Sequence, residues 1–279
     1  MPTNAQTPAS PAALDTVPIG GFRTVIATAA QFADRMVADC FAARAARQAG
    51  APLPPKLAFS SNGQGISLAG ADREFADVMN QADFVHADGM SVVFASRLPG
   101  RKRLPERIAT TDFFHDAAEA AIKSDLSFYI LGGSEAQNAA AYEAIAKAYP
   151  ALRLAGRRNG YFSREEDAAV CAEIVASGAD VLWVGLGKPL QERWSVANRE
   201  RLAGVGWLKT CGGLYAFLAG EAKRAPDWAQ AAGLEWAWRM LQEPGRLAWR
   251  YFVTNPHAIY LMLTAGPPPA RPVNAEVNG

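Results

Sequence analysis

An aspartate stands where an apolar run gives way to a turn, in the stretch DFVHADGMSVV that covers residues 83–93. The carboxylate of Asp88 has two physical uses at such a place. Asp-Gly is a turn dipeptide, so the side chain can hydrogen-bond its own backbone. A carboxylate at the end of a strand can also act as a general base that takes a proton from an attacking hydroxyl group. The local sequence leaves both interpretations of Asp88 open.

Polar and cationic residues occur near the same expected edge. Ser60 and Asn62 belong to the run KLAFSSN, and Arg107 belongs to the stretch GRKRLPERI. In an open parallel sheet, ligands bind beyond the carboxyl ends of the strands. We therefore expect Ser60, Asn62, Asp88 and Arg107 to lie near one rim. These polar and cationic neighbours favour a catalytic role for the Asp88 carboxylate over a role in the turn alone.

Two glycine turns lead from an apolar run into a helical pattern. Gly132 and Gly133 lie in FYILGGSEAQ, and Gly187 lies in LWVGLGKPLQERW, four residues before Gln191. Backbone N–H groups and a helix N-terminus at such a turn can hold a diphosphate. Neither turn has the G-x-G-x-x-G spacing of a dinucleotide site, and each can equally be a tight connection. Gln191 can bind sugar hydroxyls or a nucleobase edge, or it can cap its helix.

Short apolar runs alternate with helical patterns along the chain, which is typical of an α/β fold with a mostly parallel sheet. The clearest helix is expected at 134–148, because Ser134 precedes Gln137 as in a capping box. Another helix is expected to begin at Ser163. The pattern predicts strands near 24–28, 56–60, 83–86, 127–131, 152–156, 181–185 and 207–211.

The composition changes after Gly220. Pro244 is expected to begin a new helix there, because proline suits the first turn. The segment is either a pair of helices packed on the sheet with solvated arginines, or an interfacial element whose tryptophans and arginines meet a membrane surface. It holds four of the seven tryptophans and a basic series at helical spacing: Trp228, Trp236, Trp238, Trp249, Arg239, Arg246 and Arg250.

The bulk composition excludes several classes of protein. Half of the 279 residues are apolar, and 28 basic residues nearly cancel 27 acidic ones, so no global charge attracts nucleic acid. Neither the cysteines nor the histidines have the spacing of metal ligands, so we expect activity without a metal or cofactor. The three scattered cysteines also indicate that the protein works in a reducing cytoplasm. These cysteines and histidines are Cys40, Cys171, Cys211, His86, His115 and His257.

The domain organisation expected from composition has four parts, with no apolar run of about twenty residues that could span a bilayer. They are a disordered leader at 1–18, an α/β core at 19–220, a helical membrane-proximal appendage at 221–264 and a disordered tail at 265–279.

The chain resembles the WecG/TagA/CpsF glycosyltransferase family from about Val25 to Phe252. The resemblance implies a Rossmann-like α/β enzyme that moves a sugar from a UDP-sugar to a polyprenyl-diphosphate-linked saccharide, with inversion, for a cell-surface polymer. The motifs that carry it, in chain order, are SSN, ADGMSVV, ERIATTD, YILGG, YPALRLAGRRNGYF, GADVLWVGLGKPLQERW, GGLYAFLAG, RAPDW and GLEWAWRMLQEPGR.

The resemblance also implies residue roles. Asp88 corresponds to the proposed general base, and the appendage is implied to close over the site at the membrane. Ala216 stands where many relatives have an aspartate, and Ser60 stands where they have threonine. The residues implied to line the donor pocket are Ser60, Asn62, Arg107 and Gln191, and those implied in the appendage are Arg224, Arg239 and Arg246.

Two other functions remain as alternatives. A nucleotide-sugar-binding module would bind the donor without turnover, and an NAD-linked dehydrogenase is disfavoured by the missing G-x-G-x-x-G motif. The expected partners are a UDP-sugar, a lipid-linked saccharide acceptor and the inner face of the cell membrane, with no nucleic acid. The sequence allows a homo-oligomer but does not specify one.

Overall fold

The computed structural model describes residues 13–242 and 244–268. Their fold confirms the predicted α/β class. Eight strands form one sheet in the order β1-β2-β4-β3-β8-β7-β5-β6, and every neighbouring pair except β1 and β2 is parallel. The strands are β1 (Thr16–Ile19), β2 (Phe22–Val25), β3 (Lys56–Ser61), β4 (Phe84–Ala87), β5 (Ser127–Gly132), β6 (Arg153–Arg158), β7 (Val181–Gly185) and β8 (Trp207–Thr210).

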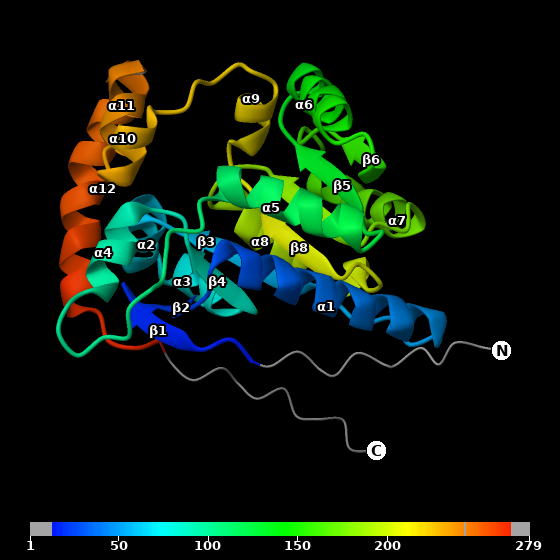
Figure 1. The fold of residues 1–279 in the computed structure, drawn as a ribbon, viewed down its shortest axis with the longest axis horizontal. Helices are drawn as coiled ribbons and strands as arrows, with labels where there is room; N and C mark the ends of the chain where they lie inside the picture. Colours follow the sequence, from blue (N-terminus) through cyan, green and yellow to red (C-terminus); the bar gives the residue numbers. More distant parts are fainter. Residues whose placement is uncertain (1–12, 243, 269–279) are drawn as a thin grey trace.

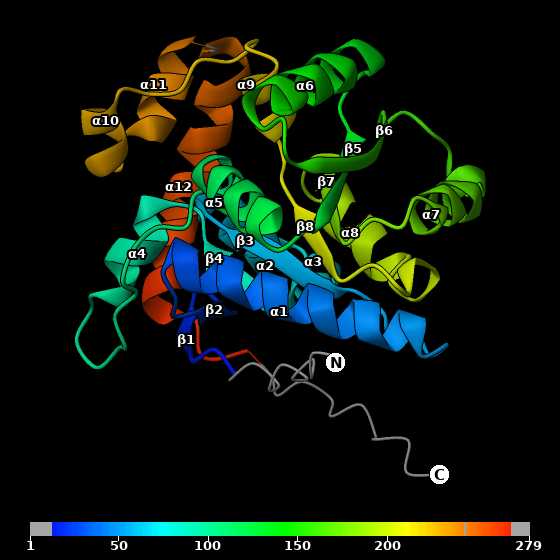
Figure 2. The same ribbon diagram turned by 45° about the vertical axis from the view of Figure 1, so that its right-hand side comes forward.

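Helices cover both faces of this sheet, and Figure 2 shows α1 and α5 lying side by side across one of them. The helices of the core are α1 (Ala29–Gln48), α2 (Gly63–Ala71), α3 (Arg73–Asn80), α4 (Met90–Ser96), α5 (Thr110–Lys123), α6 (Glu135–Ala148), α7 (Asp167–Ala176), α8 (Leu190–Ala197) and α9 (Leu214–Leu218), with short 3-10 turns η1 (Arg164–Glu166) and η2 (Glu200–Leu202).

The core has one apolar cluster on each face of the sheet. Side chains of α1, α5, α6 and α9 pack on one face, and those of α2, α3, α4, α7 and α8 pack on the other. Trp183 and Trp207 are fully buried among the rings of α1 and α5. Burying aromatic side chains on both faces explains why the central strands read as continuous apolar runs.

The first strand corrects the expected leader. Thr16–Ile19 pairs antiparallel with β2, and both Val17 and Ile19 are buried against the core. The prediction of a disordered leader up to Pro18 is therefore wrong for β1, because alternation over only four residues was too short a signal. Residues 1–12 lie outside the described part. The strand expected at 24–28 ends at Val25, and Thr28 instead caps α1.

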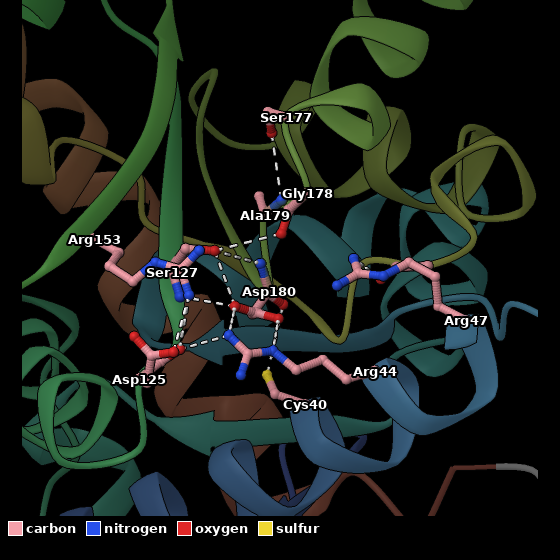
Figure 3. A network of polar contacts seen from close by, with 11 residues as sticks. Cys40, Arg44, Arg47, Asp125, Ser127, Arg153, Ser177, Gly178, Ala179 and Asp180 are labelled. Carbon is pink, nitrogen blue, oxygen red and sulfur yellow. Dashed lines mark hydrogen bonds and ion pairs between the residues drawn. The ribbon is translucent and has the colours of Figure 1, made fainter. Parts of the chain in front are cut away.

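An ion-pair network ties α1 to the amino ends of β5 and β7 (Figure 3). Arg44 makes two 2.6 Å contacts with the carboxylate of Asp180, which is only 2% exposed. That carboxylate also accepts hydrogen bonds from the backbone N–H and hydroxyl of Ser127. Because these contacts lie at the amino ends of the strands, the network fixes the fold and takes no part at the opposite rim.

Three helices form the appendage: α10 (Asp227–Ala231), α11 (Glu235–Gln242) and α12 (Pro244–Thr264). Pro244 begins a new helix, as predicted. Figure 1 shows these helices together on one side of the molecule, beside α2 and α4. The helix α12 packs along α2, where Ala258 and Met262 join the core cluster. Residues 265–268 are described, and the backbone carbonyl of Pro268 accepts a hydrogen bond from Arg23, so the expected tail does not begin as free chain.

The basic series lies on two helices rather than one. Arg239 belongs to α11, whereas Arg246 and Arg250 belong to α12. One continuous helical stripe is therefore excluded, because α11 ends at Gln242. The side chains of these three arginines lie outside the described part.

Candidate functional site

Asp88 follows β4 at the carboxyl edge of the sheet, and its carboxylate is held by two neighbouring elements. Oδ1 accepts a 2.8 Å hydrogen bond from the backbone N–H of Thr110, the first residue of α5. Oδ2 accepts a 3.2 Å hydrogen bond from the amide of Asn62, the N-cap of α2. These partners are distant in sequence, so the carboxylate is oriented by tertiary structure and not by its own turn.

The surroundings of Asp88 favour its ionised form. Burial works against the carboxylate, but the Thr110 N–H, the charge of Lys209 and the Asn62 amide favour its ionised form, and the pKa of Asp88 lies below its ordinary value. A carboxylate with a lowered pKa is present in its proton-accepting form at neutral pH. Asp88 therefore has the charge state that a general base needs.

His86 is neutral in this environment. Burial, reinforced by the nearby charge of Lys209, lowers its pKa well below the usual range. Nδ1 lies 2.8 Å from the backbone carbonyl of Ile108, which can only accept, so Nδ1 carries the proton. Nε2 is then an acceptor, and it is buried without a hydrogen-bond partner among the described residues.

A cavity of about 560 Å³ opens beside Asp88, between the rim of the sheet and the appendage. Its volume is in the range of small-molecule sites. The rim contributes polar groups and the appendage contributes mainly aromatic and apolar ones. Lining residues include Asn62, Asp88, Arg107, Glu235, Trp236 and Tyr251.

Arg107 reaches this cavity, but its charge is already matched by acidic side chains. Its guanidinium lies 2.7 Å from the carboxylate of Glu235 in α11 and 3.6 Å from that of Asp112 in α5. Arg224 also pairs with Asp112, and both arginines donate to the side-chain carbonyl of Gln230. Two of the four arginines expected in the site, Arg107 and Arg224, are thus brought together in a cluster that joins the appendage to the core, whereas the side chains of Arg239 and Arg246 lie outside the described part.

Ser60 and Asn62 lie at the end of β3, and of these two residues only Asn62 lines the cavity beside Asp88. Ser60 is buried near the end of β3, opposite His86 of β4, and its backbone carbonyl accepts a 2.9 Å hydrogen bond from the ammonium of Lys188. Asn62 uses both ends of its amide, because its oxygen accepts from the N–H of Gly65 while its nitrogen donates to Asp88. Asn62 therefore links the start of α2 to Asp88.

The Gly132–Gly133 turn is a close contact between two strand ends. A Cβ on Gly132 would lie 2.3 Å from the carbonyl oxygen of Gly185, and the N–H of Gly133 already donates to that carbonyl. The tight-connection interpretation therefore explains both glycines. Gly187 has a φ of 79°, in the left-handed region, and its carbonyl accepts from the N–H of Gln191. None of these three glycines lines the cavity beside Asp88.

Gln191 is buried and bonded inside the protein. Only 1% of it is exposed, its amide donates to Glu192, and its oxygen accepts from the N–H of Gly212. Gln191 therefore stabilises the turn after β8, and in the described part of the chain no side-chain hydrogen bond caps α8. Sugar binding by Gln191 stays a prediction. Glu192 is fully buried and pairs with Lys188 at 3.1 Å, a contact that sequence reasoning missed.

Sequence reasoning also missed Lys209. It lies within β8, is completely buried, and contacts Thr110 through its ammonium. The one available signal was a lysine inside the apolar run WLKTC, where a parallel strand leaves no solvent for a charge.

Within residues 13–242 and 244–268, no group of three or more histidine, cysteine or acidic side chains is placed to hold a metal ion. The same residues contain no helix with both the length and the apolar character needed to cross a bilayer.

Comparisons with known proteins indicate the family of this chain. The sequence model of the glycosyl transferase WecG/TagA/CpsF family matches residues 28–271. A similar protein of Bacillus subtilis (strain 168), the N-acetylglucosaminyldiphosphoundecaprenol N-acetyl-beta-D-mannosaminyltransferase, is 30% identical over 185 residues, which cover 66% of this chain and 70% of that protein. The family match includes the rim, the cavity and the appendage.

Proposed function

This chain belongs to the WecG/TagA/CpsF glycosyltransferase family, and from that premise we propose that it transfers a sugar from a UDP-sugar to a polyprenyl-diphosphate-linked saccharide with inversion. Inversion in one displacement needs a base on the acceptor hydroxyl and a stabilised diphosphate leaving group. Asp88 is the base in this proposal. The observation that carries it is an ionised, two-point-anchored carboxylate at the wall of a cavity of suitable size.

The departing UDP carries negative charge, and the cluster of Arg107 and Arg224 is the proposed counter-charge. Both arginines are engaged by Asp112, and Arg107 is also engaged by Glu235. A diphosphate would compete with these carboxylates for the same guanidinium groups, with which it also forms charge-assisted hydrogen bonds. Donor binding is therefore expected to loosen the contact between α11 and the core.

The acceptor is proposed to reach the cavity from the appendage. The relative in Bacillus subtilis acts, by its name, on N-acetylglucosaminyldiphosphoundecaprenol. An acceptor of this class keeps its diphosphate at a membrane surface, so the enzyme must present its cavity there. Trp249 and Phe252 of α12 are each 74% exposed and stack on one another, which suits contact with an interfacial region. We propose that the protein works at the inner face of the cell membrane.

The experiment that tests this function is a screen of UDP-sugars, including UDP-N-acetylmannosamine, UDP-N-acetylglucosamine and UDP-glucose. A donor at one hundred times its dissociation constant should stabilise the fold by about 2.7 kcal/mol, which thermal shift measures. The donor that stabilises the protein is then offered with a synthetic polyprenyl-diphosphate N-acetylglucosamine, and product is followed by mass spectrometry. Stabilisation by a donor without any transfer to lipid-linked acceptors would identify a binding module and overturn the proposal.

A further inference from the structure

Lys209 is a charged side chain in the middle of the sheet. Its strand, β8, lies between β3 and β7, so both edges are paired, and helices cover both faces. The side chain is 0% exposed. A lysine is among the residues least often fully buried without a partner.

The ammonium of Lys209 has polar contacts but no ion-pair partner among the described residues. Nζ donates to the backbone carbonyl of Thr210 at 2.5 Å and to the hydroxyl of Thr110 at 3.4 Å. Neutral oxygens compensate only part of the cost of removing an ammonium from water. An apolar side chain of similar length would fill the same space without that cost, so stability alone does not explain the lysine.

Thr110 connects this buried charge to the site. It is itself buried and is the first residue of α5. Its hydroxyl receives the hydrogen bond from Lys209, while its backbone N–H donates to Oδ1 of Asp88. One residue therefore contacts both the ammonium and the carboxylate.

We propose that Lys209 is a positioning residue for Asp88, which keeps the carboxylate ionised and oriented by a buried positive charge that acts through Thr110. The proposal rests on the proposed function, in which Asp88 is the base. In this proposal the positive charge of Lys209 favours the carboxylate form of Asp88, as a metal ion does in other sites. The lysine acts from its buried position in the sheet and does not contact the substrate. The electrostatic balance agrees, because the charge of Lys209 lowers the pKa of Asp88.

The other titratable groups near this pair do not take over the role of Lys209. His86 of β4 is neutral, because burial lowers its pKa well below the usual range. Lys188 is paired with Glu192, so their charges largely cancel. Cys211 stays a thiol, because burial raises its pKa to about 12. Within the described residues, Lys209 is thus a cation without an ion-pair partner that contacts Thr110, a hydrogen-bond partner of Asp88.

The test begins with the free protein. The carboxyl carbon signal of Asp88, assigned by its loss in Asp88→Asn, is titrated by ¹³C NMR in wild type and in Lys209→Met. We expect the Asp88 midpoint to move to higher pH in Lys209→Met, because the cation that favours the carboxylate is gone. Lys123→Met is the matched control, since Lys123 is exposed at the other end of α5 and should leave the midpoint unchanged.

Kinetics give the second readout. In Lys209→Met we expect kcat to fall about tenfold while KM for the donor stays unchanged, because the lysine acts on the base and not on donor binding. A merely structural role would instead lower the unfolding midpoint and leave the Asp88 titration in place. Should Lys209→Met fail to fold, Thr110→Val removes the hydroxyl contact but keeps the N–H, and it should move the titration in the same direction.

An Asp88 midpoint that is unchanged in both variants would overturn the proposal. This titration needs no sugar donor, so its failure is distinct from failure of the proposed function, which would appear as absence of transfer by the wild-type protein.

Discussion

The core and the appendage use the same residue types in opposite ways. Trp183 and Trp207 of the sheet are completely buried, whereas Trp228, Trp236 and Trp249 of the appendage are 65%, 40% and 74% exposed. Burial of these aromatic side chains therefore stabilises the core, and the core holds Asp88 in place. The appendage leaves apolar area available to something outside the chain. Chemistry is expected to depend on the core and access to a lipid-linked acceptor on the appendage.

The two regions are nevertheless joined at specific points. The helix α12 inserts Ala258 and Met262 into the core cluster, and Glu235 of α11 pairs with Arg107. The two interpretations of the appendage are therefore not exclusive. One side of α12 packs on α2, while its other side exposes Trp249 and Phe252.

Replacing the proposed base should have the largest effect. Asp88→Asn is expected to lower transfer by roughly 10²- to 10⁴-fold, because asparagine keeps the shape of the side chain and removes the proton acceptor. Donor affinity should change little, and the free energy of unfolding should fall by about 1 kcal/mol, because asparagine can accept only one of the two hydrogen bonds that hold Asp88. Initial rates with a lipid-linked acceptor measure the effect, alongside donor titration by calorimetry. A wild-type rate in this variant would show that Asp88 is not the general base.

Breaking the network in Figure 3 should destabilise the core without affecting the chemistry. Asp180→Asn leaves Arg44 without its carboxylate, and we expect a loss of about 3 kcal/mol in the free energy of unfolding. Urea denaturation measures it. Asp125→Asn is the control, because the carboxylate of Asp125 is exposed and should contribute much less. Equal losses in the two variants would contradict the assignment of the buried pair.

The buried charge of Lys209 predicts a pH-dependent stability. Burial lowers its pKa from 10.5 to about 8, so the folded state binds fewer protons than the unfolded state between these values. Stability from this group therefore rises as pH increases from about 8 to 10.5, by up to about 3 kcal/mol. Buried cysteines and tyrosines titrate in the opposite direction, so the measured quantity is wild type minus Lys209→Met. A constant difference across this pH range would contradict the prediction.

The appendage can be tested without removing it. Trp249→Gln combined with Phe252→Gln should weaken binding to anionic vesicles about tenfold or more, because two exposed apolar side chains are lost. The thermal midpoint should stay unchanged, since neither ring belongs to the core cluster. Leu53→Gln is the control, because Leu53 is an apolar side chain that is 49% exposed and lies outside the appendage. Undiminished vesicle binding in the double variant would contradict membrane contact by α12 and would leave packing against the core as its role.

The smallest expected effect is that of chelation. Activity should survive EDTA, because the proposed counter-charge for the diphosphate is the cluster of Arg107 and Arg224. Initial rates before and after dialysis against EDTA test this. Complete loss that magnesium or manganese restores would contradict it and would direct attention to Asp88, Asp112 and Asp116 as ligands.

The sequence by itself determined the architecture and much of the rim. Alternation of apolar runs with helical patterns predicts a mostly parallel sheet, and such a sheet brings its carboxyl ends to one edge. Asn62 and Asp88 meet there because each follows directly after one of two adjacent strands. Arg107 lines the same cavity. Local periodicity suffices for this part, since the fold class fixes where strand ends lie.

Only the tertiary structure decided how each side chain is used. The sequence could not predict that Gln191 is bonded internally, or that Glu235 pairs with Arg107 across 128 residues. It also could not predict that Lys209 and Asp88 contact the same threonine. These facts depend on strand order and helix docking, which place residues from distant segments within a few ångströms. Periodicity along the chain carries no such information, because it reports which face a residue occupies but not which residue it meets.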